Sequence, residues 1–224
     1  MGPDAFLLPP FFDFGATFCW AISGALVGAR RGYDIVGIFI IAMVSSTGGG
    51  LLRDGLFLQD GPPVVVRSPT YLQLVAGATV VVMLFGRRVT ALPGFQRIID
   101  VVDALGLGAY AVVGMNRATA LGLGLPGVML VGMVNAVGGA VLRSVLVGKE
   151  PHLFRPGAFE AVAALIGCAI YLVQRRGLEL SPTTAAWTTI VAVLAIRLAS
   201  VAWNVHTRAL HDFRDEWGQP PPTG

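Results

Sequence analysis

Charged side chains are scarce in this sequence of 224 residues. They make up 13% of the chain, whereas a soluble domain is typically about a quarter charged. Hydrophobic residues reach 54%, and the mean hydropathy is +0.71. A surface with so little charge is not built for water, and lipid is the simplest alternative solvent. The deficit therefore excludes an ordinary soluble protein, and the formal net charge of +3 is too small to favour a nucleic-acid partner.

The sequence also lacks the groupings that most enzymes and metal sites need. Both cysteines, Cys19 and Cys168, lie within apolar stretches, where a small buried hydrophobe is the default interpretation. No paired-carboxylate, Ser/His/Asp, Cys-x-x-Cys or phosphate-loop arrangement occurs, and the three histidines have no ligand spacing. We therefore predict no enzyme activity, no metal site and no cofactor. A basic region before the first apolar run is also missing, so no cleavable signal peptide is expected.

Long apolar runs are what the sequence has instead. A membrane-spanning helix needs roughly 20 mainly apolar residues, and several segments approach this length between clusters of Gly, Pro and Arg. They cover residues 10–29, 34–56, 70–86, 98–117, 125–147, 158–174 and 183–204. The prediction is an all-α integral membrane protein with seven transmembrane helices and a polar, mobile tail at 206–224.

Positive residues indicate the orientation of these helices. If the segments cross the membrane in turn, nine Arg and Lys residues collect on one side and four on the other. The larger group is Arg30, Arg31, Arg87, Arg88, Arg97, Lys149, Arg155, Arg208 and Arg214; the smaller is Arg67, Arg117, Arg175 and Arg176. Because Lys and Arg bias loops to the cytoplasm, we expect the N-terminus outside and the C-terminus inside.

A repeat divides the sequence into two similar halves. A shift of 90 residues aligns 13–56 with 103–146 without a gap, and 12 of the 44 positions are identical. The aligned pairs include Asp13 with Asp103, Gly24 with Gly114, Gly48-Gly49 with Gly138-Gly139, and Arg53 with Arg143. Shared leucine or valine is common in membrane helices, but a shared Asp, Arg and glycine pair in one register indicates duplication.

Each half holds three predicted spans, an odd number, so the second half must enter the membrane from the opposite face. The first repeat covers 10–93 and the second, inverted repeat covers 98–177, while the seventh helix at 183–205 has no counterpart. Inverted repeats of this kind recur in transport proteins, with the site near the midplane at the repeat interface. We therefore expect a pathway between the two halves.

The strongest local signal is a run of three hydroxyl residues followed by three glycines. It comprises Ser45, Ser46, Thr47, Gly48, Gly49 and Gly50, and the equivalent stretch contains Asn135, Gly138 and Gly139. Each glycine in a helix interior costs about 1 kcal/mol relative to alanine, so such a helix either bends or packs very closely on a neighbour. A broken helix is tolerated at membrane depth where it lines a cavity, and its freed carbonyls suit a dehydrated cation. The alternative is small-residue helix packing; the symmetric placement favours a pathway lined by these residues.

Ionisable residues within the spans are the remaining candidates, because each is unfavourable in lipid unless it is paired or hydrated. Asp13 and Arg53 fall near the outer ends of the first two spans, and Asp103 and Arg143 occupy the equivalent positions on the inner side. We predict an Asp–Arg pair at each mouth of the pathway, with Asp54 as a second candidate partner for Arg53. The alternative is that these side chains only snorkel to the membrane interface.

The duplicated block resembles the prokaryotic trimeric intracellular cation channels, whose bacterial members are also described as glycine-transporter-like proteins. The resemblance rests on the glycine triplet followed by Leu51-Leu52-Arg53-Asp54 and covers about residues 10–205. It implies a homotrimer in the bacterial inner membrane, in contact with membrane lipid, with a pore in each protomer for K⁺ and other monovalent cations such as Na⁺. It also implies that the second and fifth helices kink at their glycines and line the pore.

Two functions remain open at this point: a passive cation channel, and a gated carrier of a small zwitterion such as glycine. A carrier needs a closed midplane site with charges for both ends of its substrate, whereas a channel needs a continuous wet path with few full charges. The central polar layer offers Thr17, Ser23, Ser45, Ser46, Thr47 and Asn135, all of them neutral. This composition favours the channel.

Overall fold

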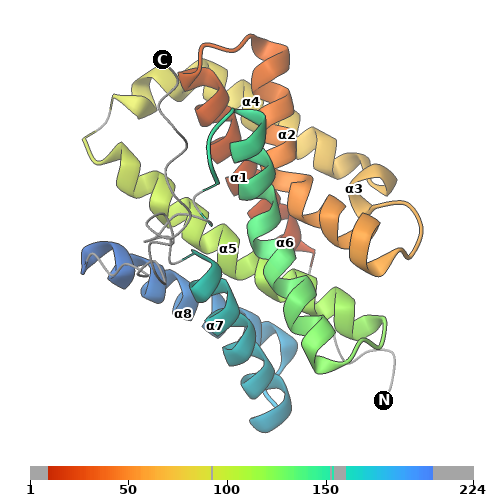
Figure 1. Cartoon of the computed structure of the whole chain (residues 1–224). Coiled ribbons are helices and arrows are strands. Elements are labelled where there is room, and N and C mark those ends of the chain that lie inside the picture. Colours follow the sequence, from red (N-terminus) through yellow and green to blue (C-terminus); the bar gives the residue numbers. More distant parts are fainter. Residues whose placement is uncertain (1–9, 92, 152, 154–159, 204–224) are drawn as a thin grey trace, which may run out of the picture.

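The computed structural model describes residues 10–91, 93–151, 153 and 160–203. Every regular element in this part of the chain is a helix, which confirms the predicted all-α class (Figure 1). In chain order the elements are α1 (Phe11–Arg30), α2 (Ile35–Leu52), the π-helix η1 (Arg53–Leu58), α3 (Val64–Arg67), α4 (Pro69–Thr90), α5 (Phe95–Ala120), α6 (Leu125–Leu146), α7 (Glu160–Leu172), the π-helix η3 (Val173–Gly177) and α8 (Pro182–Ala202).

Six segments of the described chain are long and apolar enough to cross a membrane. They are Phe11–Arg30, Ile35–Leu58, Pro69–Arg88, Ile99–Ala120, Leu125–Leu146 and Pro182–Ala202. The predicted span at 158–174 corresponds to α7, which has 13 residues and continues as η3. The count of seven transmembrane helices therefore stays a prediction, and the tail predicted at 206–224 lies outside the described residues.

The turns that join the first two helices of each half are alike. Gly32, between α1 and α2, has a φ of 71°, and Gly122, between α5 and α6, has a φ of 75°. This left-handed backbone is easily adopted only by glycine. Asp34 then caps α2, because its carboxylate accepts a hydrogen bond from the backbone N–H of Gly37 at 2.8 Å. Each turn sends the chain back as an antiparallel helical hairpin.

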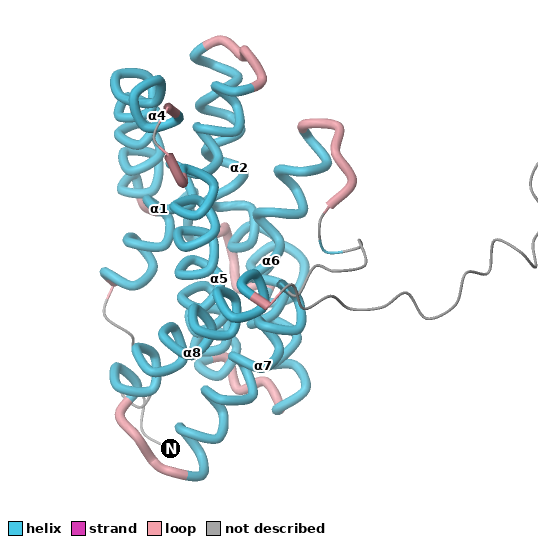
Figure 2. The backbone as a smooth tube through the Cα atoms, turned by 90° about the vertical axis from the view of Figure 1, so that its left-hand side faces the viewer, coloured by secondary structure: helices cyan, strands magenta, loops and turns pink. Residues whose placement is uncertain are grey.

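Helix α5 lies at the centre of the packing. It contacts α1, α6, α7 and α8, while α1 also packs against α2 and α4, and α2 crosses α6. In Figure 2, α1, α2 and α4 gather at one end of the molecule and α7 and α8 at the other, with α5 and α6 between them. One apolar cluster, which includes Val112 and Met115, fills the space around α5, and a second, which includes Ala21 and Val75, joins α1, α2 and α4.

Helices α2 and α6 bury matching faces. From 34 to 50 and from 124 to 140, each residue has the same degree of burial as its equivalent in the other half. The two buried runs, 45–49 and 135–139, contain the hydroxyl, amide and glycine residues singled out in the sequence. The fold thus places the predicted polar segments inside the protein, where α2 and α6 meet.

Candidate functional site

The glycines mark the crossing point of α2 and α6. A Cβ atom added to Gly49 would overlap the backbone carbonyl of Asn135, and one added to Gly139 would overlap the carbonyl of Ser45. These contacts are reciprocal, because Gly49 is equivalent to Gly139 and Ser45 to Asn135 in the repeat. Each helix therefore presents glycine to the backbone of the other, which is the small-residue packing weighed as the alternative.

Neither helix is interrupted at its glycines. The α-helical segment Ile35–Leu52 runs through Gly48–Gly50, and Leu125–Leu146 runs through Gly138 and Gly139. The broken backbone expected at these positions is therefore not present, because close packing holds both helices in α-helical form through the crossing. The change in backbone geometry comes after the triplet, where the π-helix η1 begins at Arg53. A bend within the continuous helices stays a prediction.

The three hydroxyl residues before the triplet are buried and bonded within their own helix. Ser45, Ser46 and Thr47 donate to the carbonyl oxygens one turn earlier, at 2.6, 2.9 and 2.8 Å. Such bonding is how a hydroxyl is satisfied inside a helix. Their oxygens keep lone pairs for a cation or water.

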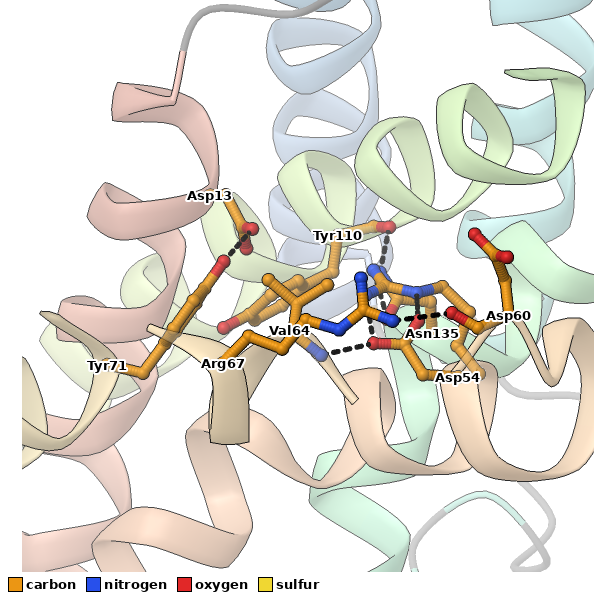
Figure 3. Close-up of polar contacts among 9 residues, drawn as sticks. Asp13, Asp54, Asp60, Val64, Arg67, Tyr71, Tyr110 and Asn135 are labelled. Carbon is orange, nitrogen blue, oxygen red and sulfur yellow. Dashed lines mark hydrogen bonds and ion pairs between the residues drawn. The ribbon is translucent and has the colours of Figure 1, made fainter. Parts of the chain in front are cut away.

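Arg53 is held in a buried network at the start of η1. Its side chain is 4% exposed, and its Nε atom lies 2.7 Å from Asp54 Oδ1. Its Nη1 donates to Asn135 Oδ1 at 3.3 Å, while Asp54 Oδ2 accepts from the backbone N–H of Val64 at 3.0 Å. Asn135 Nδ2 in turn donates to the carbonyl oxygen of Tyr110 at 2.7 Å (Figure 3). The network joins η1, α3, α5 and α6.

Asp13 is bonded to a tyrosine. Tyr71 on α4 donates its hydroxyl hydrogen to Asp13 Oδ2, as Figure 3 shows. Of the two predicted partners, Arg53 therefore pairs with Asp54, the neighbour in sequence. The expected pairing of Asp13 with Arg53 is replaced by these two separate contacts.

The second arginine is paired as the repeat predicted. Arg143 Nη2 lies 3.6 Å from Asp103 Oδ2, with the two side chains 16% and 29% exposed. Ser23 bridges the pair, since it accepts from Arg143 Nη1 and donates to Asp103 Oδ1, both at 2.9 Å. This pair is more exposed to solvent than the pair of Arg53 and Asp54. Its ion pair is therefore weaker and easier to rearrange.

Two cavities lie at these charged sites. The larger, the vestibule, holds about 500 Å³ and is lined by residues that include Ser23, Leu26, Asp103, Val137, Ala140 and Arg143. The smaller, the crevice, holds about 20 Å³, room for about one water molecule. Its lining includes Asp13, Thr17, Ser46, Thr47, Gly50, Arg53, Tyr71 and Tyr110. Among the described residues, the two cavities share no lining side chain.

Two aromatic residues of the site were not singled out in the sequence. Tyr110 is 4% exposed and bonds to Ser46 O and Thr17 Oγ1, and Tyr71 binds Asp13. Trp20 is equivalent to Tyr110 in the repeat, so a bulky aromatic at the same position of both halves was the available signal.

The fold and the site define a class of protein. Membrane-spanning helices in two matching halves enclose polar and charged groups around two cavities, which is the arrangement of a multi-pass membrane transport protein. Comparison with known proteins then gives the family. Residues 10–87 and 100–176 match the family described as Glycine transporter, and the chain belongs to this family, that of the trimeric intracellular cation (TRIC) channels.

Relatives and solved structures agree with this membership. The chain is 33% identical to a UPF0126 membrane protein of Deinococcus radiodurans, covering 73% of this chain and 75% of the relative. It is 29% identical to the UPF0126 inner membrane protein YadS of Escherichia coli K12, covering 89% and 94%. The solved TRIC orthologue from Rhodobacter sphaeroides has a TM-score of 0.79 at 28% identity, covering 87% and 97%. A structure that describes conductance through TRIC cation channels has a TM-score of 0.79 at 26% identity, covering 92% and 98%.

Proposed function

We propose that this chain is a potassium-permeable channel for monovalent cations, with a pore within each protomer. Its likeness to solved cation channels extends over 92% of the chain. The observation that carries the proposal is a pair of cavities with polar and charged linings. One lies beside the C-terminal halves of α1 and α6, and the other beside the N-terminal half of α1 and the C-terminal half of α2. The pore would run from the vestibule, past the buried hydroxyl, amide and glycine residues, to the crevice.

In the two predicted mouth pairs the arginine has an acidic partner, and the rest of the vestibule lining carries charges of both signs: Arg30, Lys149, Arg197, Asp100 and Glu160. A bare arginine would repel the permeant ion, since two unit charges 4 Å apart interact by about 4 kcal/mol at an effective dielectric constant near 20. Asp54 neutralises Arg53 and Asp103 neutralises Arg143. Asp13 adds negative charge to the crevice. In this proposal the pore-mouth charges are Asp13, Arg53, Asp54, Asp103 and Arg143.

The pore lining would consist of neutral oxygen-bearing groups. Ser46, Thr47 and Gly50 line the crevice, and Ser45 and Asn135 lie in the buried runs behind it. We propose that α2 and α6 bend at Gly48–Gly50 and at Gly138–Gly139 when the pore opens. Glycine lets the backbone carbonyls near the bend approach an ion without a side chain in between.

The proposed assembly follows the family. The chain would form homotrimers in the bacterial inner membrane, with the N-terminus outside. The two halves, 10–93 and 98–177, would be inverted repeats, with 183–205 as the added helix. The matching burial of α2 and α6 and the reciprocal glycine contacts support two related halves.

Single-channel recording tests the function directly. Purified protein in planar bilayers under asymmetric KCl is expected to give discrete currents that reverse near the potassium equilibrium potential. Replacing K⁺ by Na⁺ on one side then measures selectivity. The same preparation in liposomes tests the carrier, which would accumulate labelled glycine. Uptake of glycine without any single-channel current would overturn the channel.

A further inference from the structure

One aromatic pair lies beside the crevice, because Tyr110 lines that cavity and its ring packs against Trp20. Trp20 on α1 and Tyr110 on α5 have ring centroids 5.0 Å apart at an interplanar angle of 60°. Both side chains are 4% exposed. Along α1, Thr17 lines the crevice and Ser23 lines the vestibule, so Trp20 lies about one helical turn from each.

The indole of Trp20 lies against two glycines. A Cβ atom added to Gly106 would overlap its Nε1 atom, and one added to Gly139 would lie 3.1 Å from its Cζ3 atom. These glycines belong to α5 and α6, so the indole sits between the helices that line the vestibule. Only a residue without a side chain leaves room for the ring there.

The two rings are held very differently. The hydroxyl of Tyr110 donates to Ser46 O, so Thr17 Oγ1, at 2.9 Å, must donate to the tyrosine oxygen. The Nε1–H of Trp20 is buried and has no hydrogen-bond partner among the described residues. A buried donor without a partner destabilises the state that contains it. Rotation of the indole toward the vestibule would let water bind this N–H.

We propose that Trp20 is the gate residue of the pore, an inference that rests on the proposed channel function. In the closed state its indole blocks the path against Tyr110, Gly106 and Gly139. In the open state it turns into the vestibule, where its N–H is hydrated. Tyr110 stays in place as the fixed wall, because its hydroxyl bonds to both α1 and α2.

Two substitutions at this position should act in opposite directions. Trp20→Ala removes the plug, so the open probability in planar bilayers with symmetric KCl should rise several-fold. Trp20→Phe keeps an aromatic plug and removes the unpartnered N–H, which stabilises the closed state. The ratio of open to closed channels should therefore fall by about tenfold. Trp20→Leu, which keeps apolar volume without a planar ring, replaces Trp20→Ala if that variant does not fold. The exposed Trp203, changed to Ala and to Phe, is the matched control and should leave gating unchanged.

The outcomes separate the gate from the channel itself. The gate is supported if the wild type conducts, Trp20→Phe lowers the open probability, and Trp20→Ala or Trp20→Leu raises it. It is also supported if currents appear only in Trp20→Ala or Trp20→Leu. Wild-type currents with unchanged or jointly reduced open probability in the folded variants overturn the gate and leave the channel standing. Absence of current in wild type and in all Trp20 variants overturns both.

Discussion

Single residues explain why the two arginines, although equivalent in the repeat, are bound differently. In the first half, Tyr71 donates a hydrogen bond to Asp13. The residue equivalent to Tyr71 in the second half is Ala161, which cannot make this bond, so Asp103 is available to Arg143. Arg53 has Asp54 beside it, whereas Arg143 is followed by serine. The two halves therefore differ at two positions, Tyr71 against Ala161 and Asp54 against Ser144. As a result, Arg53 lies in a buried network, whereas Arg143 forms a more exposed ion pair.

The buried pair and the more exposed pair should differ in their contribution to stability. Removing one partner of a buried pair costs about 3–5 kcal/mol, while an exposed pair contributes about 1 kcal/mol or less. Asp54→Asn should therefore lower the thermal unfolding midpoint in detergent by several degrees more than Asp103→Asn. Replacing both members, as Arg53→Met with Asp54→Leu, should recover part of the loss. Equal midpoints for Asp54→Asn and Asp103→Asn would contradict the difference in burial.

At the scale of elements, the glycines act through contact between α2 and α6. A methyl group at Gly49 or Gly139 would meet a backbone oxygen that cannot move without shifting its helix. Gly77 on α4 has nothing within 4 Å of the same added atom. Helix propensity alone favours alanine over glycine by about 1 kcal/mol. Whether a Gly→Ala substitution stabilises or destabilises the protein therefore depends on the atoms around the added methyl group.

Gly49→Ala and Gly139→Ala should lower both the unfolding midpoint and the potassium flux into liposomes, because the crossing helices must separate. Gly77→Ala is the matched control, and it should keep the flux and leave the midpoint equal or slightly higher. Thermal unfolding followed by tryptophan fluorescence and a potassium-driven flux assay measure the two quantities. A normal midpoint in Gly49→Ala would show that α2 and α6 do not meet as described.

The helices and the pairing of Asp103 with Arg143 could be predicted from the sequence, because hydropathy and a gap-free repeat report on them directly. The partner of Arg53 could not be chosen, since the repeat favours Asp13 and the chain offers Asp54. The choice depends on Tyr71 of α4, which bonds to Asp13 and has no equivalent tyrosine in the second half. The sequence also could not predict that α2 and α6 continue through their glycines, because glycine permits both a bend and a close approach between helices.

At the scale of the whole molecule, the two halves meet through reciprocal contacts. Gly48 lies against Leu142 and Gly138 against Leu52, each at 2.9 Å for an added Cβ atom. Each contact becomes the other when the halves are exchanged, as expected for a pseudo-two-fold axis between them. If that axis lies in the membrane plane, equivalent loops must face opposite sides of the bilayer.

Asp60 and Glu150 test this orientation, because they are exposed and occupy equivalent positions after the second helix of each half. In a background with Cys19→Ala and Cys168→Ala, Asp60→Cys should react in intact cells with a membrane-impermeant maleimide. Glu150→Cys should react only after the membrane is opened, since the loop containing Lys149 belongs to the arginine- and lysine-rich side. Labelling of both after permeabilisation controls for accessibility. Reaction of both cysteines in intact cells would place equivalent loops on one face, and the two halves would then be parallel repeats with no inverted pore between them.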